Sequence, residues 1–206
     1  METISYTKLE ISIDGNIGAG KTSVLEELKR RGYITEPQRF EQINVLIDNF
    51  YKNERTSENI YVLQKKIYEI YKETWNTIYN KPYEYRFLEG IISSVNVFAV
   101  RSYEKKEISD EDYLKLQNDC NLERDGIIPH LIIYLDCHPE LSKKRLENDN
   151  SRKIIELDYF EEIHLYYERF LKSTNIEILH LNVENHSIGQ IVDKIFLFLE
   201  NKNKKF

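Results

Sequence analysis

The chain has few of the residues that interrupt regular structure or cross-link small folds. It contains 7 glycines and 4 prolines among 206 residues, which leaves little sequence for long flexible linkers. Its two cysteines, Cys120 and Cys137, have neither metal-ligand nor redox spacing, so a disulfide scaffold is not predicted. We therefore expect a reducing, cytoplasmic compartment.

The sequence also lacks long apolar runs and any excess of positive charge. No run approaches the length of a membrane span, and the N-terminus has no signal-peptide core. A net charge of −6 argues against a nucleic-acid or membrane surface, so any phosphate site must be a local positive pocket. A chain of 206 residues is long enough for one well-buried α/β domain and too short for two.

Strand-like segments alternate with helical patterns along the chain. We expect strands at residues 9–14, 33–35, 85–89, 131–135 and 177–181. Helices are expected at residues 23–31, 43–50, 57–79, 91–105, 110–122, from 138 onward, 157–171 and 187–200. The uninterrupted apolar run at 131–135 is typical of a central parallel strand. The pattern predicts an α/β fold with a five-stranded parallel sheet and helices on both faces.

A phosphate-binding loop is the most specific motif in the sequence. Residues 15–22 read G-N-I-G-A-G-K-T, which matches G-x-x-x-x-G-K-[ST] between a predicted strand and a predicted helix. The loop N–H groups and the helix N-terminus would surround phosphate oxygens. Lys21 would reach the β- and γ-phosphates of ATP, and the Thr22 hydroxyl would bind Mg²⁺. The expected cofactor-binding residues are Gly15, Asn16, Ile17, Gly18, Ala19, Gly20, Lys21, Thr22 and Ser23.

Two glutamates stand at the carboxyl ends of predicted strands, where parallel α/β sheets bind ligands. Glu36 could accept the proton of an attacking hydroxyl, and Glu89 could approach the Mg²⁺ ion. Each could equally be a structural or solvated strand-end glutamate. Position alone does not decide between these interpretations.

Further candidates are arginines and aromatic residues. Arg145 and Arg152 flank a polar stretch and fit a lid that closes over phosphates, although arginines on a solvated helix face have the same pattern. Five aromatic residues could line a base-stacking pocket, or could belong to the core: Phe40, Phe50, Tyr51, Tyr61 and Tyr68.

Taken together, these motifs resemble the deoxynucleoside kinase family. The matching segments occur in the family's order along nearly the whole chain: residues 13–22, Glu36-Pro37, 49–55, Leu63-Gln64, 135–140, 160–171 and 181–184. The resemblance implies one P-loop kinase-type three-layer domain over residues 1–206, with a short lid at about 145–154, and a homodimer. It implies that Glu36 is the catalytic base, that Phe40 and Tyr51 shape the base and sugar pocket, and that Gln64 reads the base.

The sequence departs from the family pattern after the third strand. The family usually has Glu-Arg-Ser there, whereas this chain has Glu89-Gly90-Ile91, and the later Asp-Arg pair is replaced by residues 93–96, S-S-V-N. Arg86 or Arg101 could substitute for the missing arginine.

Three functional hypotheses follow. The first is an ATP- and Mg²⁺-dependent (deoxy)nucleoside 5′-kinase of nucleotide salvage, in which Lys21, Glu36, Arg145 and Arg152 act in catalysis. The second is a nucleoside monophosphate kinase, such as a thymidylate kinase, which needs an additional arginine for its substrate's phosphate. The third is a nucleotide-binding scaffold that has lost catalysis, motivated by the missing arginine and the missing Asp-Arg pair. The expected partner in each case is a small molecule.

Overall fold

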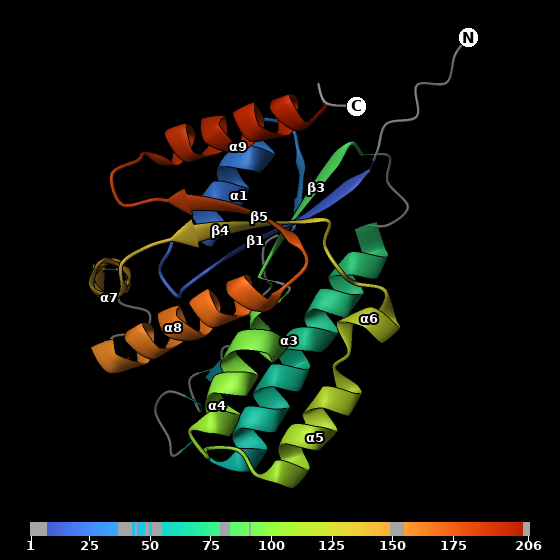
Figure 1. Ribbon diagram of the computed structural model, residues 1–206, viewed down its shortest axis with the longest axis vertical. Helices are drawn as coiled ribbons and strands as arrows, with labels where there is room; N and C mark the ends of the chain where they lie inside the picture. Colours follow the sequence, from blue (N-terminus) through green and yellow to red (C-terminus); the bar gives the residue numbers. More distant parts are fainter. Residues whose placement is uncertain are drawn as a thin grey trace.

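A parallel sheet of five strands forms the centre of the molecule (Figure 1). The computed structural model describes residues 8–36, 43, 45–47, 50, 55–78, 83–90, 92–148 and 155–203. The strands lie in the order β2-β3-β1-β4-β5, and every neighbouring pair is parallel. Their bounds are β1 Leu9–Gly15, β2 Ile34–Glu36, β3 Tyr85–Glu89, β4 Leu131–Asp136 and β5 Glu177–Asn182. The five strands predicted from the sequence are confirmed.

Helices cover both faces of the sheet, which gives three layers. α1 and α9 pack on one face, and α3, α4 and α8 lie on the other (Figure 1). The helices are α1 Lys21–Arg30, α3 Ser57–Ile78, α4 Val100–Glu104, α5 Asp110–Asp119, α6 Leu122–Asp125, α7 Pro139–Asn148, α8 Leu157–Ser173 and α9 Ile188–Asn203, with a π-helix at Ser94–Ala99. No helix in the described part of the chain is long and apolar enough to span a membrane.

The alternation of side chains along the central strands divides the apolar residues between two cores. Ile11 and Ile13 of β1 belong to the cluster under α1 and α9. Ile132 and Tyr134 of β4 belong to the cluster under α3 and α8. Because both faces of β1 and β4 are covered, these strands are apolar almost without interruption, as buried parallel strands are.

The sheet topology brings the two sequence candidates Lys21 and Glu89 to one edge. The connection from β1 runs across β3 to β2, and the connection from β3 runs the other way, across β1 to β4. Connections that diverge in this way leave a crevice at the carboxyl ends of β1 and β3. Glu89 pairs with Ile13 in register, and the Gly90 N–H donates to the Ile13 carbonyl at 2.9 Å. The phosphate loop that follows β1 and the end of β3 therefore face the same crevice.

Two predicted helices differ from the structure. The segment predicted as one helix over 91–105 forms the π-helix and then α4, and hydrophobic periodicity does not distinguish these turns. The helix predicted over 110–122 ends at Asp119 because Asn121 caps a new helix, its side chain accepting from the Arg124 N–H at 2.8 Å. The predicted acidic first turn of α5 is confirmed, with Ser109 as its N-cap.

Candidate active site

Lys21 lies folded over the loop that precedes it. Its ammonium group donates to the carbonyls of Gly15 at 2.9 Å and Asn16 at 3.0 Å. These contacts hold the charge above the loop, where the N–H groups at the start of α1 also converge. The loop thus presents a fixed positive charge to an anion.

Gly18 and Gly15 are required by their neighbours as well as by the loop conformation. Gly18 has φ +78°, and a Cβ there would lie 2.4 Å from the backbone oxygen of Ser142 in α7. A Cβ on Gly15 would lie 2.7 Å from the backbone oxygen of Leu135 in β4. No larger residue fits either position without moving backbone.

Asn16 connects the loop to α8. Its side chain donates to the Phe160 carbonyl at 2.8 Å and accepts from the Ile17 N–H at 2.8 Å. Asn16 is fully buried, and its side chain is used in these contacts. Among the predicted cofactor-binding residues, Gly15, Asn16 and Ala19 support the loop from behind, while the other six line the cavity described below.

Thr22 and Glu89 come together at the start of α1 and the end of β3. The Thr22 hydroxyl donates to one Glu89 oxygen at 3.1 Å. A hydroxyl and a carboxylate are the hard oxygen ligands that Mg²⁺ prefers, and Mg²⁺ takes its remaining ligands from water and phosphates. This pair therefore fits a magnesium ion. Among the described residues no group of three or more His, Cys, Asp or Glu side chains could hold a metal, so a site filled mainly by protein ligands is not present there.

Asp14 is buried directly beneath the loop. Burial raises its pKa to about 6, an effect that a hydrogen bond from Ser12 and the charge of Lys21 partly oppose. The carboxyl of Glu89 adds to the rise. Two tyrosines, Tyr71 and Tyr167, lie in the same buried region, and burial next to Asp14 raises the pKa of both hydroxyls well above its usual value.

A cavity of about 660 Å³ extends from the loop to α3. Its phosphate end is lined by loop residues together with α7 and the start of α9: Ile17, Gly18, Gly20, Lys21, Thr22, Ser23, Arg145, Leu146, His186, Ser187 and Ile188. Its acceptor end is lined mainly by apolar side chains of α3 and nearby segments: Ile47, Phe50, Leu63, Gln64, Ile67, Tyr71, Glu89, Gly90, Ser93, Phe98 and Tyr159. The volume lies within the range of small-molecule sites.

Gln64 is buried in the acceptor end, on the same α3 face as Tyr71. Its amide can both donate and accept hydrogen bonds, as the edge of a nucleobase does. Phe50 also lies in the wall, as the sequence analysis predicts. Tyr61 and Tyr68 do not line the cavity, since their hydroxyls donate to Asp119 and Asp125 on α5 and α6.

Arg145 reaches the phosphate end from α7. Its guanidinium lies 3.4 Å from the Ala19 carbonyl oxygen and 3.5 Å from that of Val183. Every other arginine in the described ranges has a carboxylate partner there, whereas none of the described carboxylates pairs with Arg145. A cavity-lining guanidinium without a counter-ion is suited to binding an anionic ligand.

The proposed substitutes for the missing arginine are wrong. Arg86 is fully buried at the other end of β3, paired with Glu10 and bonded to the Trp75 carbonyl at 3.1 Å. Arg101 is paired with Glu107 and Glu162. Neither lines the cavity, because each is held by its carboxylate partners: Arg86 by the buried Glu10, and Arg101 by the partly exposed Glu107 and Glu162.

Several predicted site residues cannot be placed. Phe40, Tyr51 and Arg152 lie outside the described residues, as does the lid beyond position 148. Glu36 is the last residue of β2, where it pairs in register with Leu88, and its side chain is outside the described part. Its backbone position at the carboxyl edge agrees with the prediction.

Some lining residues have no motif that marks them. The sequence patterns give no site role to Tyr71, Phe98, Tyr159 or the turn 186–188, and Ser93 enters only as part of the segment that replaces the Asp-Arg pair. Only Tyr71 has a usable signal, because it lies seven residues after Gln64 and therefore on the same face of α3.

A family model for deoxynucleoside kinase matches residues 11–204. The chain belongs to the deoxynucleoside kinase family. It is accordingly a nucleoside kinase, a phosphotransferase that binds nucleotides. A relative of this deoxynucleoside kinase, described as a probable deoxycytidine kinase of fowlpox virus (strain NVSL), is 28% identical over 193 residues, which cover 85% of this chain and 79% of the relative.

Solved structures of deoxyadenosine kinase from M. mycoides share the fold of this deoxynucleoside kinase. The structure with bound dCTP has a TM-score of 0.78 and 19% identity, and the match covers 94% of this chain and 100% of that one. The structure with bound dATP has a TM-score of 0.77 and 19% identity, with 93% and 99% covered. The predicted family and the predicted α/β kinase fold are thus confirmed.

Proposed function

We propose that this nucleoside kinase transfers the γ-phosphate of ATP to the 5′-hydroxyl of a (deoxy)nucleoside bound against α3. One observation carries the proposal: Lys21, Thr22 and Glu89 share a single cavity with Gln64 and with Arg145, which pairs with no carboxylate among the described residues. A phosphate-binding end and a base-sized, largely apolar end are what such a transfer requires.

The chemistry assigns a role to each residue. Lys21 and Arg145 stabilise the negative charge on the transferring phosphoryl group. Thr22 and Glu89 would hold Mg²⁺, whose charge would offset that of the donor phosphates. The nucleoside 5′-oxygen forms its bond to the γ-phosphorus while the bond to the β,γ-bridging oxygen breaks, and ADP leaves. The hydroxyl proton passes to the carboxylate of Glu36.

The acceptor is held by side chains rather than by backbone. Gln64 reads the base edge, and Phe50 packs against the ring. Phe40 and Tyr51 complete the base and sugar pocket in this proposal, and Arg152 closes with the lid at about 145–154. The names of the relatives suggest deoxycytidine and deoxyadenosine as the first acceptors to test. We also propose one kinase domain per chain and a homodimer, which sedimentation at micromolar concentration would test.

A phosphoryl-transfer screen tests the proposal. ATP with Mg²⁺ is incubated with the common ribo- and deoxynucleosides, in parallel with Lys21→Ala. We expect at least one deoxynucleoside to yield its 5′-monophosphate, and the rate in Lys21→Ala to fall by about 10²–10³-fold. Transfer to nucleoside monophosphates instead would support a monophosphate kinase. Nucleotide binding without transfer to any acceptor would support a silent scaffold.

Glu36→Gln tests the assigned base. The amide keeps the shape of the side chain but cannot accept the proton, so we expect kcat to fall by about 10²–10⁴-fold with the donor KM unchanged. A rate close to that of the wild type would remove Glu36 from the mechanism.

A further inference from the structure

The turn that precedes α9 forms part of the cavity wall opposite the phosphate loop. His186, Ser187 and Ile188 all line the cavity. The Cδ1 atom of Ile188 lies 4.0 Å from the position that a Cβ on Gly20 would take. The start of α9 therefore lies close to Gly20, the N-cap residue of α1.

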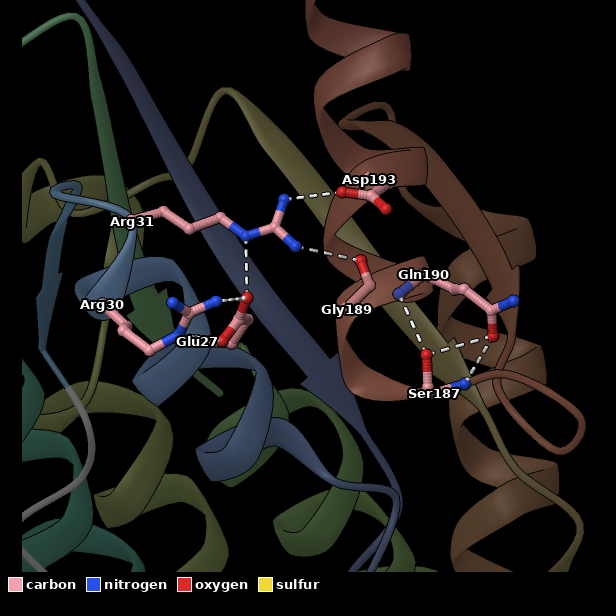
Figure 2. Close-up of polar contacts among 7 residues, drawn as sticks. All are labelled: Glu27, Arg30, Arg31, Ser187, Gly189, Gln190 and Asp193. Carbon is pink, nitrogen blue, oxygen red and sulfur yellow. Dashed lines mark hydrogen bonds and ion pairs between the residues drawn. The ribbon is translucent and has the colours of Figure 1, made fainter.

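A capping box fixes the shape of this turn. The Ser187 N–H donates to the Gln190 side chain at 2.9 Å, and the Gln190 N–H donates to the Ser187 hydroxyl at 3.3 Å (Figure 2). This reciprocal pair satisfies N–H groups at the helix start. Both residues belong to the same turn, so the capping box does not set where α9 lies relative to the phosphate loop.

Arg31, which follows α1, adds polar contacts to the buried apolar packing between α1 and α9 (Figure 2). One terminal nitrogen donates to Asp193 at 2.6 Å and the other to the Gly189 carbonyl at 3.3 Å. Its Nε donates to Glu27 of α1 at 2.8 Å. The planar guanidinium thus bonds to two acceptors in the first turns of α9, while Glu27 of α1 fixes its orientation, a set of contacts that a point charge such as lysine cannot match.

The neighbouring Arg30 offers a matched comparison. It is the more exposed of the two, and both of its bonds go to Glu27 within α1, at 2.6 and 2.7 Å (Figure 2). Arg30 therefore has the same charge and nearly the same position as Arg31 but does not reach α9.

The position of this wall points to the donor nucleotide. The acceptor end of the cavity is built by α3, on the opposite face of the sheet from α1 and α9 (Figure 1). A donor whose β- and γ-phosphates lie at Lys21 must extend its nucleoside away from the acceptor end. In this cavity that direction leads toward Ile188 and Ser187.

We propose that Arg31 is a positioning residue for the donor nucleotide: by holding the start of α9 against α1, it keeps the wall formed by His186, Ser187 and Ile188 in place for the donor nucleoside. This inference rests on the proposed function, because it takes the phosphate loop as the site of the donor triphosphate. Arg31 itself does not line the cavity.

The test compares Arg31→Ala and Arg30→Ala with the wild type. The KM for ATP, the KM for the acceptor and kcat are measured with the acceptor found in the screen, and the Kd for ADP with Mg²⁺ is measured by calorimetry. We expect Arg31→Ala to raise the ATP KM and the ADP Kd about tenfold, with kcat and the acceptor KM within about twofold. Arg30→Ala should leave all four values within about twofold. Asp193→Ala, which removes one of the three bonds, should give a smaller rise.

Two results would overturn the proposal. Arg31→Ala could weaken donor binding no more than Arg30→Ala does. Alternatively, it could lower kcat and weaken both substrates together with a lower melting temperature, which would indicate a purely structural role. If the wild type binds ADP but phosphorylates no nucleoside, the proposed function fails, and the ADP Kd of the two variants still decides the role of Arg31. If the wild type binds no ADP, both proposals fail.

Discussion

The two ends of the cavity are built in different ways. At the phosphate end the ligand would meet backbone N–H groups and the charge of Lys21, which the loop carbonyls hold within 3.0 Å. At the acceptor end it would meet the side chains of Phe50, Leu63 and Gln64. Phosphate recognition therefore depends on a local loop conformation, whereas nucleoside recognition depends on how helices from distant parts of the chain pack.

The largest effect that tests this comparison is expected at Arg145. Arg145→Ala removes the described arginine that has no carboxylate partner, so we expect kcat to fall by about 10²–10³-fold. Arg145→Lys keeps the charge without the planar fork and should recover part of the rate. Single-turnover measurements at saturating ATP would separate this effect from binding.

Arg124→Ala is the matched control for Arg145. Arg124 lies on α6 and bonds to Asp125, outside the cavity wall. Equal rates for Arg145→Ala and Arg124→Ala would mean that Arg145 only supports the Ala19 and Val183 backbone, and that the phosphate end is confined to the loop.

A smaller and differently distributed effect is expected at Gln64. Gln64→Leu keeps the volume of the side chain but removes its hydrogen bonds, so the acceptor kcat/KM should fall about tenfold to a hundredfold. The ATP KM should not change, because Gln64 lies at the acceptor end. Steady-state kinetics with each substrate varied in turn would measure both.

Gln117→Leu, on α5 and outside the cavity wall, controls for the loss of an amide. If Gln64→Leu raised the KM for ATP as much as that for the acceptor, the cavity would not have two separable ends.

The smallest expected effect is the pH dependence of protein stability that Asp14, buried beneath the loop, produces. The pKa of Asp14 is raised from 3.8 to about 6, so the folded protein binds this proton more tightly than the unfolded chain does. The contribution of Asp14 to stability is therefore present at low pH and is lost as the pH rises through 6. Asp14→Asn removes this dependence. The free energy of unfolding of Asp14→Asn minus that of the wild type should be about 1 kcal/mol higher at pH 8 than at pH 5, because only the wild type loses stability over this range.

Urea unfolding of both proteins at the two pH values measures this difference, with the exposed Asp110→Asn of α5 as the control. A difference of the opposite sign would mean that Asp14 is held ionised by Lys21, and that the loop depends on this charge.

The same contrast explains what the sequence could predict. The phosphate loop and its flanking strand and helix are contiguous, so residues 15–22 are sufficient to predict the loop, Lys21 and Thr22. Glu89 could be proposed because it ends a strand, and the sheet register then places it beside Thr22. The chemistry of the phosphate loop itself is local and is therefore predictable, whereas Arg145 and the turn 186–188 reach it from distant segments.

The residues that line the acceptor end, and the ion-pair partners of the arginines, could not be predicted in this way. Arg86 has the position of a site residue in the sequence, but its partner Glu10 lies on β1, and only the register of the sheet brings the two together. Ser93 lines the cavity just before the π-helix, an element that hydrophobic periodicity does not distinguish from an α-helix. Pairings of this kind depend on contacts between segments tens of residues apart, which a pattern along one segment does not contain.

The contact between Gly18 and the Ser142 backbone has a consequence for the history of such chains. A glycine at this position is demanded by the packing of α7 whether or not a phosphate is ever bound. A descendant that lost its activity would have to keep Gly18 in order to fold, while Lys21 would be free to drift. In comparisons of distant relatives, Gly18 therefore records the packing of α7, whereas Lys21 records continued selection for catalysis.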